Sequence, residues 1–275
     1  MHFIDGALYA QVKKYAALTP VFAVPGAGGG AILSDKAAFG HEFLQHNIYS
    51  PGGDLRHIDW KVYARRDRLY LKKYHTETSL RCVIGMDASA SMAFASKWDF
   101  ARTLACATAL LLAQSGARCG FFIAGESVVK IQPGEQSALE RFDETLYTAK
   151  CAGANSPFAA PVFPPSKDTP HLIFTDMQQE NFQWPFVGGG AVIHIIAAEE
   201  RSCPWNGRAV FSDMETGEEL ACGGADITAG YEREFALWLK QCAAAVRARG
   251  VHYVPLYTDM TTAQAFEKIA AALWR

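Results

Sequence analysis

Paired cysteines, long apolar runs and an excess of charge are all missing from this chain of 275 residues. Its seven cysteines occur singly, with no C-x-x-C pair. This pattern disfavours a disulfide framework and favours reduced thiols, as at Cys82 and Cys106 in apolar segments. The apolar stretch from 105 to 113 is too short to cross a bilayer, and the N-terminus lacks the basic-then-apolar layout of a signal peptide. We therefore expect a soluble, cytoplasmic protein without a membrane span.

Several functional signatures are absent as well. The formal net charge is only −2, so the composition implies no bulk surface for a polyanion. The chain has no P-loop and no G-x-S-x-G nucleophile elbow. A G-x-G-x-x-A string ends at Ala31, but Pro25 lies in its turn and no acid closes a second strand at the expected distance. We interpret this stretch as a flexible glycine-rich loop rather than a dinucleotide site.

Strand and helix patterns alternate from residue 80 onward, which predicts a mostly parallel sheet with helices on both faces. The predicted strands span 80–86, 117–124, 127–131, 171–176, 191–197 and 251–256, and the predicted helices span 96–115, 137–150, 229–249 and 262–274. A peripheral hairpin is expected at 207–222. Ser96 with Asp99 suggests a variant capping box at the first of these helices. We divide the chain into an N-terminal segment, 1–79, packed on an α/β domain, 80–275.

The most informative stretch follows the first of these strands. Asp87, Ser89 and Ser91 form a D-x-S-x-S loop where a buried strand ends. Ligands bind at that end of the strands in open α/β sheets, and these hard oxygen donors suit Mg²⁺ or Mn²⁺. A simpler interpretation is that the loop only caps the next helix. An aspartyl-phosphate enzyme is disfavoured because Ser89 stands where a second Asp is usual.

Two later loops are expected at the same sheet edge. Asp176 ends the predicted strand 171–176, and the loop 153–156 lies between the two strands in sequence. This order resembles the metal-ion-dependent adhesion site of von Willebrand factor A-like domains, in which the second loop supplies a Thr and the third an Asp. Asp176 matches the third element. The second loop has no Thr, so the resemblance implies that Asn155 or Ser156 stands in as a ligand.

The segment before the sheet carries a longer resemblance. The string Tyr-Ser-Pro-Gly-Gly-Asp-Leu-Arg-His-Ile-Asp-Trp, from Tyr49 to Trp60, together with the D-x-S-x-S loop, resembles the bacterial family called domain of unknown function 58. The family usually has a second Asp where Gly53 stands. Its members pair a von Willebrand factor A-like domain with a segment of this kind and are linked to MoxR-type AAA+ ATPases. The resemblance therefore implies such an ATPase as the partner.

Together these features predict a module for metal-ion-dependent protein–protein interaction without catalysis of its own. An incompletely coordinated Mg²⁺ or Mn²⁺ would accept a carboxylate from a partner or client protein. Two alternatives remain open. Basic and aromatic residues are interleaved from Arg56 to Lys73, which suits nucleic-acid binding, although intervening acids favour a buried Arg–Asp network instead. The second alternative is a Mg²⁺-dependent phosphoryl-transfer enzyme, which the lack of a P-loop or of paired catalytic acids disfavours.

Overall fold

The computed structural model divides the chain into two compact units, one of Met1–Leu33 with Leu80–Arg275 and one of Ser34–Ser79. It describes residues 2–16, 21–22, 31–32, 42–48, 70–75, 81–133, 137–153, 157–158, 162–164, 166–167, 169–178, 184–186, 189–202, 208–212, 218–223 and 226–274. The first helix, α1 (Gly6–Tyr15), belongs to the unit that contains the sheet.

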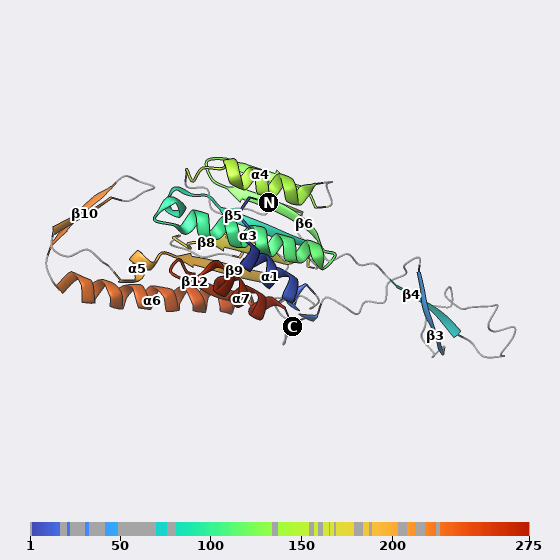
Figure 1. The fold of residues 1–275 in the computed structure, drawn as a ribbon. Helices are drawn as coiled ribbons and strands as arrows, with labels where there is room; N and C mark the ends of the chain where they lie inside the picture. The colour runs from blue at the N-terminus through green and yellow to red at the C-terminus, as the bar shows by residue number, and fades with distance from the viewer. Residues whose placement is uncertain are drawn as a thin grey trace. The chain divides into compact units, whose positions relative to one another are not determined.

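A six-stranded sheet forms the centre of the larger unit (Figure 1). Its strands are β5 (Arg81–Asp87), β6 (Arg118–Ala124), β7 (Val128–Ile131), β8 (His171–Thr175), β9 (Gly190–Ile196) and β12 (His252–Tyr257). They lie in the order β12-β9-β8-β5-β6-β7, and every pair is parallel except the hairpin β6–β7. Every predicted sheet strand is present within two residues of its expected ends, and the predicted von Willebrand factor A-like α/β class is confirmed.

The strand order fixes where a ligand site can lie. Numbered along the chain from β5, the order is 3-2-1-4-5-6, which is the doubly wound order with its third strand reversed. The order reverses between β5 and β8, so the loops after these two strands leave in different directions and open a crevice at the carboxyl edge. Asp87 and Asp176 follow these two strands. The predicted first and third loops therefore meet at the switch point of the sheet.

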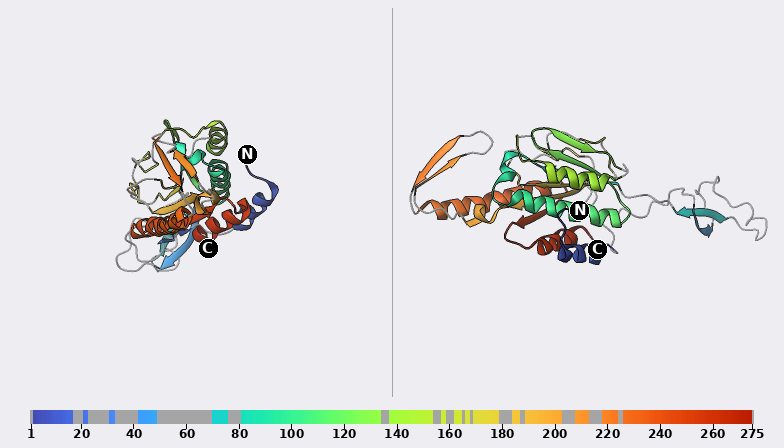
Figure 2. Two further views of the ribbon diagram at one scale, coloured as in Figure 1. Left: turned by 90° about the vertical axis from the view of Figure 1, so that its left-hand side faces the viewer. Right: turned by 45° about the horizontal axis from the view of Figure 1, so that its top comes forward.

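Helices cover both faces of the sheet, as predicted (Figures 1 and 2). On one face lie α1, α3 (Lys97–Gln114), α4 (Ala138–Thr148) and α7 (Thr262–Leu273), whose apolar residues join one core cluster with Ile84 and Met86 of β5. On the other face, α6 (Asp226–Ala248) contributes Cys242 and Val246 to a second cluster with Val83 of β5. This alternation along β5 is what a strand buried on both faces requires.

Close packing on the second face of the sheet leaves room only for glycine at position 85 of β5. A Cβ atom added there would lie 2.3 Å from Cζ of Phe122 and 2.7 Å from Cδ1 of Ile173. The aromatic ring of the neighbouring strand occupies the space that any side chain at this position would need. The glycine thus lets β5 stay in the sheet while the rings of the second face pack over it.

The remaining elements are short or peripheral. β10 (Arg208–Ser212) and β11 (Glu219–Gly223) form the predicted hairpin, and α5 (Ala198–Ser202) follows β9. β1 (Val21–Phe22) pairs with β2 (Ala31–Ile32). In the smaller unit, β3 (Glu42–Ile48) pairs with β4 (Tyr70–His75). The predicted Arg–Asp network around Arg56 lies outside the described residues.

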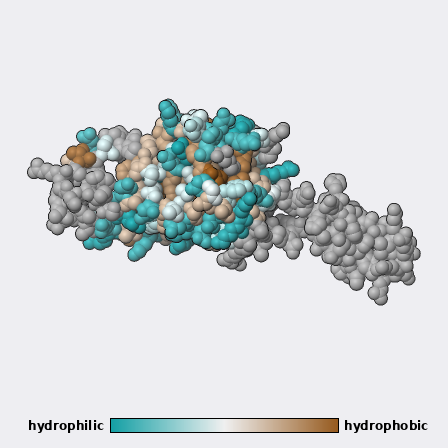
Figure 3. All heavy atoms as spheres, in the orientation of Figure 1, coloured by the Kyte–Doolittle hydropathy of each residue, from teal (hydrophilic) through white to brown (hydrophobic). Residues whose placement is uncertain are grey.

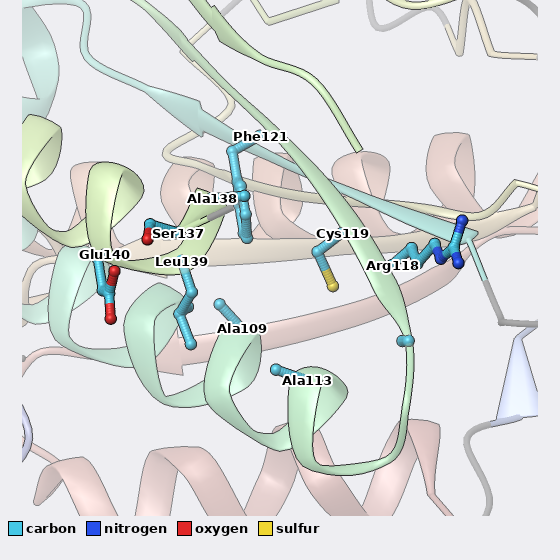
Figure 4. Close-up of a pocket in the computed structure, with 10 residues that line it drawn as sticks. Ala109, Ala113, Arg118, Cys119, Phe121, Ser137, Ala138, Leu139 and Glu140 are labelled. Carbon is cyan, nitrogen blue, oxygen red and sulfur yellow. The ribbon is translucent and has the colours of Figure 1, made fainter. Parts of the chain in front are cut away.

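The described part of the larger unit contains a pocket lined mainly by apolar residues. The face of the larger unit in Figure 3 mixes hydrophilic and hydrophobic residues. A pocket of about 290 Å³ lies between α3, α4 and β6, lined by small apolar residues with Cys119, Arg118 and Glu140 at its sides (Figure 4). It is at the amino end of β6, away from the switch point. Within the described part of the chain, no helix has the length and hydropathy needed to cross a membrane.

Candidate functional site at the carboxyl edge of the sheet

A hydrogen bond joins the ends of the two central strands, β5 and β8, at the base of the site. Thr175, the last residue of β8, donates its hydroxyl to Oδ2 of Asp87 at 2.6 Å. The amide of Met177 donates to the same hydroxyl at 3.1 Å, which fixes the direction in which the third loop leaves the strand. The other oxygen of Asp87 accepts the amide of Ser89 at 3.0 Å. Asp87 is therefore held by both of its oxygens and is buried.

Burial gives Asp87 unusual electrostatics. Removal from water and, next, the nearby charge of Asp176 raise its pKa to about 6, while the hydrogen bonds from Thr175 and Ser89 act in the opposite direction. Two carboxyl groups in one dry site disfavour each other's ionised form. The same arrangement would favour a cation, since positive charge relieves both the burial cost and the repulsion.

The first loop presents its hydroxyls side by side. Oγ of Ser89 lies 3.1 Å from Oγ of Ser91, at the start of a short 3₁₀ helix, η2 (Ala90–Ala93). Neither Ser89 at η2 nor Ser96 at α3 makes a side-chain capping bond. The capping-box prediction for Ser96 is wrong, because its backbone is not in the extended conformation that aims a cap at the helix amides. The hydroxyls of Ser89 and Ser91 contact each other and do not cap η2, so both remain candidate oxygen ligands, as the motif predicts.

The described start of the second loop lies against the first. The amide of Ala152 donates to the carbonyl of Ala88 at 2.9 Å, and the amide of Ala90 donates to the carbonyl of Gly153 at 3.0 Å. Gly153 has φ +78°, a left-handed conformation that glycine adopts readily. The two predicted ligands that follow, Asn155 and Ser156, lie outside the described residues.

The third loop reveals two charged residues that the sequence analysis did not assign to the site. Oδ2 of Asp176 accepts a hydrogen bond from Nζ of Lys97 at 2.7 Å, and the same ammonium donates to Oε1 of Glu200 at 2.9 Å. Lys97 is only 1% exposed. Glu200 also anchors the loop after β9, because its Oε2 accepts the amide of Ala197 at 2.8 Å. The two acids Glu199 and Glu200, which follow the predicted strand 191–197, were the sequence signal that could have identified Glu200.

Lys97 stays charged in this buried position. Burial by itself lowers its pKa, but the charges and hydrogen bonds of Asp176 and then Glu200 outweigh that effect, and the pKa is raised. Its ammonium also lies 5.6 Å from the centre of the Phe94 ring. Lys97 is the first residue of α3, so the helix that starts after the D-x-S-x-S loop carries the counter-ion of the third loop.

The donor set fits a hard divalent cation. The site contains three carboxylates, from Asp87, Asp176 and Glu200, and one ammonium, from Lys97, which leaves a formal excess of two negative charges. Carboxylate and hydroxyl oxygens are the ligands of Mg²⁺ and Mn²⁺. Across the described residues, no cluster of three or more His, Cys, Asp or Glu side chains forms a metal cage. Any ion here would therefore depend on serine hydroxyls and water as well as on carboxylates.

The comparison with known families bears on this site directly. Residues 45–236 match the family described as Protein of unknown function DUF58. The chain belongs to the DUF58 family. The predicted resemblance is thereby confirmed, and all of the site residues, from Asp87 to Glu200, lie inside the DUF58 match.

Curated relatives of this DUF58 chain are themselves uncharacterised proteins, one from Mycobacterium bovis and two from strains of Mycobacterium tuberculosis. Each is 31% identical over 98 residues, which is 34% of this chain and 31% of the relative. The match thus spans just under a third of the length of these relatives.

Two solved structures are similar at low identity. One is described as conserved hypothetical protein BatB from Bacteroides thetaiotaomicron, with 12% identity and a TM-score of 0.37. The other is described as an aerotolerance-related membrane protein from Bacteroides fragilis, with 14% identity and a TM-score of 0.40. Each alignment covers 70% of this chain and 98% of the other. The strand order, rather than these likenesses, carries the fold assignment.

Proposed function

We propose that this DUF58 chain is a metal-ion-dependent protein–protein interaction module that has no catalytic activity of its own. The observation that supports the proposal is the buried cluster at the switch point, where oxygen donors converge with an excess of negative charge. Asp87, Ser89, Ser91 and Asp176 would hold Mg²⁺ or Mn²⁺, with a contribution from Asn155 or Ser156. The bound ion would supply a Lewis-acidic docking point for a carboxylate of a partner.

The partner that we propose is a MoxR-type AAA+ ATPase, and the biological role is the assembly or remodelling of a protein complex in the cytoplasm. Membership of the DUF58 family supports this choice, since the family resemblance implies such an ATPase. The chemistry of the site adds one requirement. The partner must present an Asp, a Glu or a terminal carboxylate, because those groups complete the shell of a hard cation.

Calorimetric titration with MgCl₂ and MnCl₂ tests the ion site. The wild-type chain should bind one ion, and Asp87→Asn should abolish binding while the chain remains folded by circular dichroism. Asp99→Ala is the matched control, because it removes an acid whose side chain is 72% exposed and lies outside the cluster. Equal binding by the wild type and Asp87→Asn would refute the proposed site.

A pull-down with the purified MoxR-type ATPase of the same organism tests the mode of interaction. EDTA should release the complex and added Mg²⁺ should restore it. Ser89→Ala should weaken it about as much as Asp87→Asn, since each removes an oxygen donor from one cation. A complex that survives EDTA and both substitutions would mean that the partner uses another surface. Turnover of phosphate esters with Mg²⁺, abolished by Asp87→Asn, would instead establish an enzyme.

A further inference from the structure

Lys97 is a cation that the protein has built into its own acidic site. Its side chain is 1% exposed and its ammonium lies within hydrogen-bond distance of Asp176 and Glu200. The position is fixed by the fold, because α3 begins at Lys97 and contacts both β5 and β8.

The lysine changes what the two acids can offer. Oδ2 of Asp176 accepts from Lys97 at 2.7 Å, and Oδ1 accepts the amide of Gln178 at 3.4 Å. Both oxygens of this predicted ligand therefore already have donors in the protein. Asp87, by contrast, has no lysine or arginine partner among the described residues, and only neutral donors reach it. The negative charge left for an incoming ion is concentrated on the Asp87 side of the site.

We propose that Lys97 determines the ion affinity of the site, by neutralising the third loop so that the resting protein binds a divalent cation weakly. This inference rests on the proposed function. A fixed positive charge within a few ångströms repels a second cation and so lowers its affinity. A partner's carboxylate supplies the missing negative charge. Ion and partner then bind cooperatively, each raising the affinity for the other.

A charge series at Lys97 and Glu200 tests the inference. Glu200→Gln lowers the negative excess and Lys97→Met raises it, so the affinity for Mg²⁺ should increase in the order Glu200→Gln, wild type, Lys97→Met. We expect Lys97→Met to bind at least about tenfold more tightly than the wild type, the effect expected of removing one nearby cation. The double variant restores the charge balance and should return to within about threefold of the wild type.

Thermal unfolding in EDTA and in 10 mM MgCl₂ provides a second measurement. Lys97→Met leaves buried carboxylates without their counter-ion, so it should melt far below the wild type in EDTA and recover much of that loss in Mg²⁺. The wild type should melt at nearly the same temperature in both buffers. Lys14→Met is the control, because it breaks an exposed ion pair, with Glu267, elsewhere on the surface. Its melting temperature should not respond to Mg²⁺.

Two results would overturn the role of Lys97. One is Mg²⁺ binding of equal or lower affinity in Lys97→Met, with Asp87→Asn still abolishing binding. The other is a Lys97→Met protein that Mg²⁺ does not stabilise, together with unchanged affinity in Glu200→Gln. Binding by both proteins, with an affinity at least about tenfold higher in Lys97→Met, supports the inference. If Mg²⁺ binds wild type, Lys97→Met and Asp87→Asn equally, the ion site of the proposed function fails instead.

Discussion

The hydroxyl of Thr175 lies 2.6 Å from Oδ2 of Asp87 and joins the ends of the two strands between which the sheet reverses its order. Both residues are buried, and the pairing register of β5 with β8 ends one residue short of this contact. Beyond the last backbone pair, this side-chain hydrogen bond continues the link between the two strands. It therefore holds the starts of the first and third loops of the site together.

Thr175→Val should destabilise the fold and loosen the site. It removes a hydrogen bond to a buried carboxylate without changing the side-chain shape, so we expect a loss of about 1.5–3 kcal/mol in the free energy of unfolding. Urea denaturation measures the loss, and Thr175→Ser, which keeps the hydroxyl, should retain most of the stability. A valine variant as stable as the wild type would show that the contact is not formed in solution.

Gly85→Ala should be destabilising despite the small size of alanine. The added Cβ would overlap the Phe122 ring, and overpacking of this kind typically costs about 1–3 kcal/mol. Combining it with Phe122→Leu should restore part of that loss, because the overlapping ring is removed. Melting temperatures of the two single variants and the double variant would establish the coupling. Strictly additive effects would contradict direct contact between the two positions.

His171 should make the stability of the protein depend on pH. Burial against the Phe186 ring, with centroids 4.0 Å apart, lowers its pKa to about 4. The unfolded chain therefore binds more protons than the folded chain between about pH 6.5 and pH 4, so this group's contribution is present above pH 6.5 and is lost on acidification through that window. The full shift corresponds to about 3 kcal/mol.

The variant His171→Phe isolates that contribution, since a phenyl ring can take over the stacking but cannot bind a proton. The difference in unfolding free energy between wild type and variant should change across the window and stay flat above pH 7. The stability of the wild type alone would not isolate His171, because Asp87 also titrates in this window. Its raised pKa has the opposite effect on the free energy of unfolding and favours the folded state at low pH. A pH-independent difference would mean that His171 is solvated.

Asp143 should anchor the start of the chain. Its carboxylate accepts the amide of His2 at 3.0 Å and lies 2.8 Å from Nδ1 of the same residue, although the side chain of Asp143 is only 4% exposed. Asp143→Ala should therefore speed hydrogen exchange in α1 and lower the stability by about 1–3 kcal/mol. Glu144→Ala, at an exposed neighbouring position, should do neither. Unchanged exchange in α1 would show that packing alone holds this helix.

The sequence by itself determined the order and type of the elements from residue 80 onward. Continuous apolar runs marked the buried strands. It also placed Asp87 and Asp176 at one edge, because a residue that follows a parallel strand must emerge at the carboxyl side of the sheet. These inferences depend only on local periodicity and chain direction, which the sequence contains. The strand β3 was missed, because its residues show no alternating pattern.

Only the tertiary structure decided which groups meet those acids. Lys97 stands in the first turn of α3, a position where a lysine is ordinarily solvated, and the direction of its side chain depends on how α3 crosses the sheet. Glu200 reaches the same ammonium from α5, which follows β9, and Thr175 reaches Asp87 through the β5–β8 register. Crossing angles and registers follow from the packing of side chains far apart in sequence. The acids Asp87 and Asp176 could therefore be predicted from the local sequence pattern, whereas the position of their counter-ion, Lys97, was decided by tertiary packing.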